Sequence, residues 1–426
     1  MDERRATVMG LGSFGGGAGA VRYLAQQGYD VLVTDMAPAE KLATSLKAIG
    51  DLIETGSVTL RLGEHNVSDF TTCDLVVANP AVKLPWQNRF IQSAQAAGVR
   101  VTTEIGLVVD ALPKSCTLIG VTGSSGKSTT SAMIHAGLLA AGQRAILGGN
   151  IGGSLLEQQI PDKAIVALEL SSAMLWWLAQ PGCTERKAFL DTAIITNLAP
   201  NHVDWHGSAE HYAASKLGIT HFLKDTGSLF IGQGVDLDHG RAHRIELAPT
   251  LPELATPGSP NRINASAALA ACQAVGADPD RAATGIGGFK GLPHRLELVR
   301  SHNGVRWYND SKSTTPEATR LALQALKPAR VHLIVGGSDK GVDLAPIAEL
   351  VRQSAALYCI GKTGETIAEI AGIEAAGTLS EAVRLAAESA KEGEAVVLSP
   401  GCASFDQFRS FEDRGNQFRE LVHSLA

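Results

Sequence analysis

The sequence predicts an α/β protein of three domains, each built on a mostly parallel β-sheet. The first observation is length: 426 residues are more than a single domain with one hydrophobic core usually contains. The second is that apolar, strand-like segments alternate with helical patterns in three successive blocks, as parallel sheets require. We place the domains at residues 1–112, 113–294 and 295–426.

The composition of the chain argues against two classes of binding partner, nucleic acids and membranes. Hydrophobic residues make up 45% of the chain, enough for several cores, and the net charge of −6 comes without a basic block. We therefore expect no nucleic-acid partner. No stretch approaches the roughly 20 apolar residues of a membrane helix, so we expect no membrane insertion. The six cysteines are scattered singly, without a CxxC pair, which predicts reduced thiols and a cytoplasmic protein.

The first block opens with a strand–helix–strand unit. The strand Ala6–Met9 leads into the glycine-rich turn Gly10–Gly15, a helical stretch and then the strand Tyr29–Asp35, which ends in a carboxylate. This order is typical of a Rossmann-like domain, and it leaves nicotinamide binding open as one interpretation. A further strand candidate, Leu75–Pro80, closes with a turn at the strand end where open α/β sheets bind ligands.

The second block carries the strongest motif. An apolar strand at Ile119 breaks into Thr122-Gly-Ser-Ser-Gly-Lys-Ser-Thr129, just where a helical pattern begins. Such a turn directs backbone N–H groups and a helix N-terminus at phosphates; Lys127 can reach the outer phosphates and Ser128 can ligate Mg2+. Val121 stands where the strict motif has its first glycine, and an ordinary glycine-rich turn is the alternative. We expect a P-loop ATPase-like central domain.

Two further side chains of this block suit a metal ion. Glu169 ends the buried strand Ala164–Glu169, and a carboxylate there can hold Mg2+ that bridges phosphates. His202 lies in the turn after a strand that begins near Ala193. The alternatives are a helix-capping carboxylate and a solvated histidine.

Read with Lys216 and the segments that follow, this order resembles the Mur ligase family, and within it the branch that adds D-glutamate to UDP-N-acetylmuramoyl-L-alanine. The resemblance covers nearly the whole chain. The matching segments are Thr122–Thr129, Gly148–Gly152, Glu169–Ser172, Asn201–Asp204, Ser215–Leu217, Gly291–Arg295, Asn309–Lys312, Gly336–Gly337 and Ser399–Ser404.

The resemblance implies an ATP-dependent amide ligase that works through an acyl phosphate. It implies ATP and two Mg2+ ions as cofactors, with Ser128, Glu169, His202 and Lys216 as metal ligands. Lys216 matches a lysine that is carbamylated in the family; unmodified, it would be a surface lysine on a helix. The expected small-molecule substrates are UDP-N-acetylmuramoyl-L-alanine, glutamate and ATP, and the expected state is a monomer.

The resemblance also assigns residues to four sites, residue by residue. The catalytic positions are Lys127, His202, Lys216 and His294. The ATP positions are Gly123, Ser124, Ser125, Gly126, Lys127, Ser128, Thr129, Asn261, Asn264, Arg295 and Asp310. The UDP-substrate positions are Ser13, Phe14, Asp35, Asn79, Ala81 and Asn150. The amino-acid positions are Lys312, Thr314, Lys340, Ser404 and Phe411.

Three alternatives stay open. The same chemistry could add L-glutamate or another acidic amino acid. A nicotinamide-dependent oxidoreductase would rest on Gly10, Gly12, Gly15 and Asp35. A nucleotide-binding switch without ligase chemistry would retain the phosphate loop.

Overall fold

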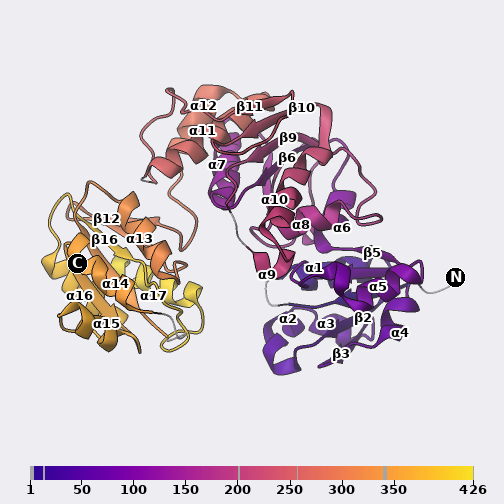
Figure 1. Cartoon of the computed structure of the whole chain (residues 1–426), viewed down its shortest axis with the longest axis horizontal. Coiled ribbons are helices and arrows are strands. Elements are labelled where there is room, and N and C mark those ends of the chain that lie inside the picture. Colours follow the sequence, from indigo (N-terminus) through magenta and orange to yellow (C-terminus); the bar gives the residue numbers. More distant parts are fainter. Residues whose placement is uncertain (1–3, 13–14, 200–201, 257, 339–342, 426) are drawn as a thin grey trace. The chain divides into compact units, whose positions relative to one another are not determined.

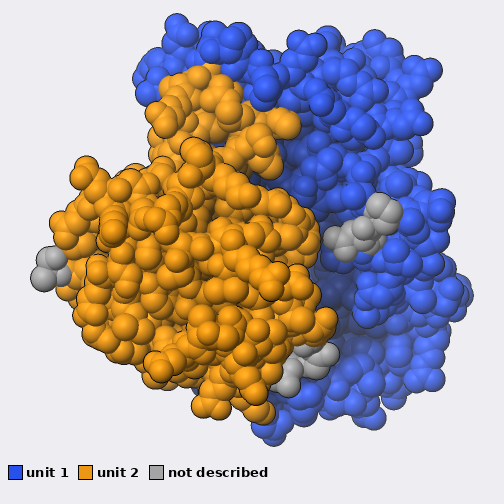
Figure 2. Space-filling model, turned by 60° about the vertical axis from the view of Figure 1, so that its left-hand side comes forward, with its two compact units in different colours: residues 1–250, 264–286 blue, residues 251–263, 287–426 orange. Residues whose placement is uncertain are grey.

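The computed structural model describes residues 4–12, 15–199, 202–256, 258–338 and 343–425. It divides into two compact units, residues 1–250 with 264–286 and residues 251–263 with 287–426, which Figure 2 colours separately. Figure 1 shows their helices and strands, labelled where there is room. The predicted α/β class, with three mostly parallel sheets, is confirmed. The three domain boundaries stay a prediction.

The first sheet has the strand order β3-β2-β1-β4-β5, and all of its neighbouring strands are parallel. Because β1 lies between β2 and β4, the turn after β1 sits where the strand order reverses, which is the ligand-binding position of open α/β sheets. The strands are β1 (Arg4–Met9), β2 (Tyr29–Asp35), β3 (Val58–Leu62), β4 (Leu75–Ala78) and β5 (Arg100–Thr102). The helices are α1 (Gly16–Gln26), α2 (Ala43–Ala48), α3 (Gly50–Glu54), α4 (Val67–Thr71), α5 (Arg89–Ala96) and α6 (Glu104–Ala111).

The second sheet, also parallel throughout, has the order β11-β10-β9-β6-β8-β7. Its central strand β6 pairs with β8 and β9, which brings three carboxyl ends together. The strands are β6 (Thr117–Thr122), β7 (Ala145–Gly149), β8 (Ile165–Glu169), β9 (Leu190–Ile195), β10 (Leu223–Ile231) and β11 (Ala242–Arg244). The helices are α7 (Lys127–Ala140), α8 (Ser172–Leu178), α9 (Val203–His206), α10 (Ala209–Leu217), α11 (Ser259–Ala274) and α12 (Pro279–Gly287).

The third sheet, in the second unit, has the order β12-β13-β16-β14-β15. Only the β12–β13 pair is antiparallel among its described pairings, so this sheet too is mostly parallel. The strands are β12 (Glu297–His302), β13 (Val305–Asn309), β14 (Val331–Gly336), β15 (Ala356–Ile360) and β16 (Ala395–Leu398). The helices are α13 (Pro316–Ala325), α14 (Ala345–Ala348), α15 (Gly364–Ala371), α16 (Leu379–Ser389) and α17 (Phe411–His423).

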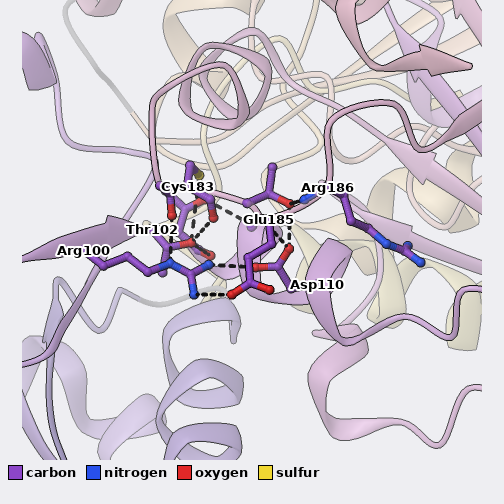
Figure 3. A network of polar contacts seen from close by, with 10 residues as sticks. Arg100, Thr102, Asp110, Cys183, Glu185 and Arg186 are labelled. Atoms are coloured by element: carbon purple, nitrogen blue, oxygen red, sulfur yellow. Dashed lines mark hydrogen bonds and ion pairs between the residues drawn. The ribbon is translucent and has the colours of Figure 1, made fainter.

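A polar network joins the two sheet regions of the first unit (Figure 3). Arg100 pairs with Asp110 at 2.8 Å, and the Thr102 hydroxyl donates to the Cys183 carbonyl at 2.5 Å. Gly106 packs closely against this contact, since a Cβ there would lie 2.3 Å from the Cys183 carbonyl oxygen. Among the described helices, none has the length and apolar character of a membrane span.

Candidate functional site

The turn between β6 and α7 requires glycine at two positions. Gly123 and Gly126 have φ values of +145° and +81°, a region that side chains rarely adopt. A Cβ on Gly123 would lie 1.9 Å from the Thr196 hydroxyl oxygen, and one on Gly126 would lie 2.5 Å from the side-chain oxygen of Asn264. The backbone can therefore curl tightly at the start of α7, as a phosphate-binding loop does.

The serines and the lysine of this turn are held in place. The Asn197 side-chain oxygen accepts from Ser125 N at 2.9 Å, and the Tyr212 hydroxyl donates to Ser124 Oγ at 3.0 Å. Lys127, the first residue of α7, donates from Nζ to the carbonyls of Gly123 and Ser124 at 2.9 and 3.2 Å. Ser128 and Thr129 follow in the first helical turn. The predicted phosphate-loop residues thus form one structural element.

Glu169 supplies the clearest sign of a ligand. It ends β8 with 1% of its surface exposed, and its Oε1 accepts from Asn150 Nδ2 at 3.1 Å. Its Oε2 is buried without a hydrogen-bond donor. A buried carboxylate oxygen without a hydrogen-bond donor suits a bound cation.

Lys216 is also buried, with 1% of its surface exposed on α10. Its Nζ donates to Thr122 Oγ1 at 3.4 Å and lies 4.9 Å from the centre of the Tyr212 ring. Burial, followed by the charge of Lys127, lowers its pKa to about 7. The expectation that an unmodified lysine would lie on the surface is wrong, because α10 packs against α8 and the Lys216 side chain reaches Thr122 of β6.

His202 precedes α9 in a left-handed conformation, with φ +48°. Desolvation lowers its pKa, and the charges of Lys216 and Lys127 add to that shift. Its ring centre lies 6.2 Å from that of Tyr212. The structure therefore gathers His202, Lys216, Lys127 and Glu169 at the carboxyl ends of β6 and β8. Among the described residues, no three His, Cys, Asp or Glu side chains are placed so that they could hold a metal ion together, so an ion here would need other ligands as well.

The predicted UDP-substrate residues gather at the first glycine turn. Asp35, at the end of β2, accepts from Leu11 N at 2.9 Å and from Gly12 N at 3.4 Å. Asn79, just after β4, donates to the Gly10 carbonyl at 3.1 Å and accepts from Ala81 N at 2.9 Å. Ser13 and Phe14 lie outside the described residues. Asn150 lies instead beside Glu169.

A second cluster lies in the C-terminal unit. Burial raises the pKa of Asp310 to about 6, and Ser399 Oγ donates to its Oδ2 at 2.7 Å. Lys312 Nζ lies 5.2 Å from the centre of the Phe411 ring, and its backbone N donates to the His294 carbonyl at 3.0 Å. The rings of His294 and Phe411 pack edge to face at 6.0 Å.

The remaining assigned residues have these positions. Arg295 is close enough to Asp310 for its charge to favour the ionised carboxylate. Ser404 is buried in the turn after β16, and Thr314 precedes α13. Asn261 and Asn264 lie on α11, Asn264 against the phosphate loop. Lys340 lies outside the described residues.

Two site residues are absent from the sequence predictions. Tyr212 lies between the phosphate loop and Lys216, and its position four residues before Lys216 on a helix was the available signal. His206, with 2% of its surface exposed, has its Nε2 2.9 Å from Ser172 Oγ. Burial, and then the charge of His211, lowers the pKa of His206 to about 4.

Family models match all three regions of the chain. Residues 4–103 match the MurD-like N-terminal domain of Mur ligases, residues 121–248 the Mur ligase middle domain, and residues 294–402 the glutamate ligase domain of Mur ligases.

Relatives match over the full length. The chain is 36% identical to the UDP-N-acetylmuramoylalanine--D-glutamate ligase of Symbiobacterium thermophilum, with 100% of this chain and 99% of the relative covered. It is 34% identical to the enzyme of that name from Roseiflexus sp. (99% and 99% covered) and 33% to that from Streptococcus pneumoniae (99% and 98%).

Solved structures share the fold. The UDP-N-acetylmuramate-alanine ligase of Thermotoga maritima aligns with a TM-score of 0.58 at 17% identity, covering 99% of each chain. The MurF ligase of Thermotoga maritima, solved in complex with ADP, aligns with a TM-score of 0.52 at 16% identity, covering 79% of this chain and 92% of that one.

The nicotinamide-dependent alternative is not supported by these matches. Full-length identity of 32–36% to ligases of one name, together with the three matching domain models, shows that the chain belongs to the Mur ligase family.

Proposed function

We propose that this chain joins D-glutamate to UDP-N-acetylmuramoyl-L-alanine at the expense of ATP, in the cytoplasmic synthesis of peptidoglycan precursors. Relatives named UDP-N-acetylmuramoylalanine--D-glutamate ligase match the chain over its full length. The structural observation that carries the proposal is the buried, unpartnered Oε2 of Glu169 beside the phosphate loop and Lys216. Such a site suits ATP-dependent chemistry, since it combines cationic side chains with a buried carboxylate oxygen that could ligate a metal ion.

The reaction runs in two steps. The terminal carboxylate of the UDP-linked alanine attacks the γ-phosphorus of ATP, which forms an acyl phosphate and releases ADP. The amino group of glutamate then attacks the acyl carbon, the tetrahedral intermediate expels inorganic phosphate, and the nitrogen loses its extra proton. Both steps bring anions together, so Lys127 and the N-terminus of α7 hold the phosphates by opposite charge.

The chain's own residues fit Mg2+ in this place. Ser128, Glu169, His202 and a carbamylated Lys216 would hold it, with two ions expected, and the unpartnered oxygen of Glu169 is the structural observation in favour. When bound, Mg2+ neutralises charge on the transferred phosphoryl group.

The surroundings of Lys216 support its carbamylation. With a pKa near 7, a large share of its amine is neutral at physiological pH and therefore nucleophilic. The Nζ lone pair attacks the carbon of CO2, an N–C bond forms, and one N–H proton leaves to solvent. The product is a carboxylate on Lys216, in place of an amine whose positive charge would repel a metal ion.

The other assignments divide between the substrates. We assign Asn261, Asn264, Arg295 and Asp310 to the ATP site. His294, which directly precedes Arg295 in the sequence, is assigned as a catalytic position. The UDP substrate would contact Ser13, Phe14, Asp35, Asn79, Ala81 and Asn150. Glutamate would contact Lys312, Thr314, Lys340, Ser404 and Phe411. We propose a monomer as the working state.

The test is phosphate release by the purified protein with ATP, Mg2+ and UDP-N-acetylmuramoyl-L-alanine, comparing D-glutamate, L-glutamate and no amino acid, with the product mass measured in parallel. Release that depends on D-glutamate, with the UDP-muramoyl dipeptide as product, is the expected result. Dependence on L-glutamate would keep the chemistry and change the substrate. Phosphate release without amide formation would favour a nucleotide-binding switch.

A further inference from the structure

The imidazole of His206 contacts the segments that carry two of the proposed metal ligands, Glu169 and Lys216, and its backbone belongs to the segment that carries a third, His202. Its Nε2 lies 2.9 Å from Ser172 Oγ, and its Nδ1 lies 2.9 Å from His211 Nδ1 and 3.5 Å from Ser215 Oγ. Its backbone N donates to the carbonyl of His202 at 3.0 Å. With 2% of its surface exposed, the side chain makes these contacts away from solvent.

Each contact leads to one proposed metal ligand. Ser172 begins α8, three residues after Glu169 at the end of β8. Ser215 immediately precedes Lys216 on α10. His202 precedes α9, the short helix that His206 ends. His206 therefore belongs to the His202 segment through its backbone, and its ring contacts the segments of the other two ligands.

A neutral imidazole suits this position because its two nitrogens face opposite ways, one as donor and one as acceptor. The ring itself is packed: its centre lies 4.5 Å from that of Trp205 and 5.4 Å from that of Tyr212. Packing fixes the ring, and the ring in turn fixes two hydroxyl-bearing segments. Metal ligands held by such a support bind more tightly than ligands that must be ordered on binding.

We propose that His206 is a positioning residue that sets Glu169, His202 and Lys216 at the spacing a divalent cation requires. The inference rests on the metal ligands named in the proposed function, and it adds the residue that aligns them. His206 itself touches neither substrate nor metal in this proposal.

Three substitutions distinguish the contacts of the two ring nitrogens of His206. His206→Phe keeps an aromatic ring and removes both nitrogens. His206→Gln can place an amide near the position of Nε2 and so retain the contact with Ser172, whereas His206→Asn can place one near Nδ1 and retain the α10 side. The matched control is His332→Phe: His332 is also buried, with Tyr358 and Glu394 as polar partners, but it lies on β14 in the second unit.

The measurement is Mn2+ binding by electron paramagnetic resonance, with a non-hydrolysable ATP analogue present, alongside KM for Mg2+ and for the UDP substrate. We expect His206→Phe to weaken Mn2+ binding roughly 10- to 100-fold, the range for residues that support metal ligands. The Gln and Asn variants should fall between it and the wild type. KM for the UDP substrate should stay unchanged, as should Mn2+ binding by the His332→Phe control.

Mn2+ binding by folded His206→Phe equal to that of the wild type would overturn the proposal. Where circular dichroism shows that His206→Phe does not fold, the Gln and Asn variants decide: wild-type binding by both overturns it, and weakened binding by either supports it. Mn2+ binding needs no amino-acid substrate, so a wild type that binds Mn2+ but makes no amide would refute the proposed function separately.

Discussion

Two glycine turns of the first unit look alike in sequence and differ in how the neighbouring strand-end carboxylate is satisfied. In the first turn, Asp35 accepts hydrogen bonds from Leu11 N and Gly12 N, so the carboxylate completes the turn itself. In the second, Glu169 follows the strand beside the phosphate loop, and its Oε2 has no donor. The first carboxylate is bonded within its own turn, whereas one oxygen of the second has no hydrogen-bond donor.

This difference indicates that the Glu169 site lowers the stability of the fold, whereas the Asp35 turn does not. A buried, unsatisfied carboxylate oxygen costs on the order of 1–3 kcal/mol or more relative to a bonded one. Glu169 is as buried as the apolar core around it, and Lys216 nearby is buried with a lowered pKa. Counting hydrogen bonds at strand ends therefore distinguishes two turns that motif matching groups together. The predictions below test whether Glu169 serves the metal site and whether Asp35 stabilises the first glycine turn.

The largest expected effect is on the phosphate loop. Lys127→Ala should lower turnover by about 100- to 1,000-fold or more, because it removes a charge that neutralises the transferred phosphate. The measurement is phosphate release at saturating ATP. Lys114→Ala, which removes an exposed lysine of the same domain, is the control and should retain full turnover. Near-normal turnover in the Lys127 variant would remove the loop from the chemistry.

The next effect concerns the buried lysine. Lys216→Ala should lower kcat by roughly 100-fold, in the range that removal of one charge-stabilising group produces. Acetate or formate should restore part of the activity, because a small carboxylate can enter the space and replace the carboxylate of the proposed carbamate. The same anions should not rescue Lys127→Ala, whose missing group is a cation. No rescue of the Lys216 variant would indicate that the unmodified amine, not a carbamate, is the working group.

The third effect separates function from stability at the open carboxylate. Glu169→Gln keeps an acceptor for Asn150 and removes the charge, so Mg2+ affinity should fall at least about 10-fold, as it does when groups around a metal site are replaced. The thermal midpoint should change little, because Oε2 makes no hydrogen bond that the substitution breaks. Differential scanning fluorimetry and the Mg2+ dependence of turnover measure the two quantities. A large loss of stability with unchanged Mg2+ dependence would make Glu169 a structural residue.

The sequence predicts those features that neighbouring residues determine. The strand ending at Glu169, the glycines before Lys127 and the strand ending at Asp35 can each be recognised within a few residues, and the structure has them where expected. The burial of Lys216 could not be predicted, because a polar helix segment gives no sign that this face packs against the sheet.

Contacts between segments that are distant in the sequence could not be predicted from it either. Tyr212 reaches Ser124 across 88 residues, and His206 reaches Ser172 across 34, so no local pattern records either pair. These contacts depend on the strand order that places β6, β8 and β9 side by side, which only the folded chain supplies. The ligands of the proposed metal site are therefore visible in the sequence, and the residues that hold them are not.

The smallest expected effect tests the satisfied carboxylate. Asp35→Ala leaves the N–H groups of Leu11 and Gly12 without their acceptor, which should cost about 1–3 kcal/mol in the local stability of this turn. Amide hydrogen exchange at these two residues should then accelerate by roughly 5- to 150-fold, since 1.4 kcal/mol corresponds to a factor of ten. Asp35→Asn retains one acceptor oxygen and should show a smaller acceleration. The Mg2+ dependence of turnover should not move in either variant, because the metal site belongs to the other sheet. If Asp35→Ala instead changes Mg2+ dependence as Glu169→Gln does, the two carboxylates act on one site and the contrast between the turns fails.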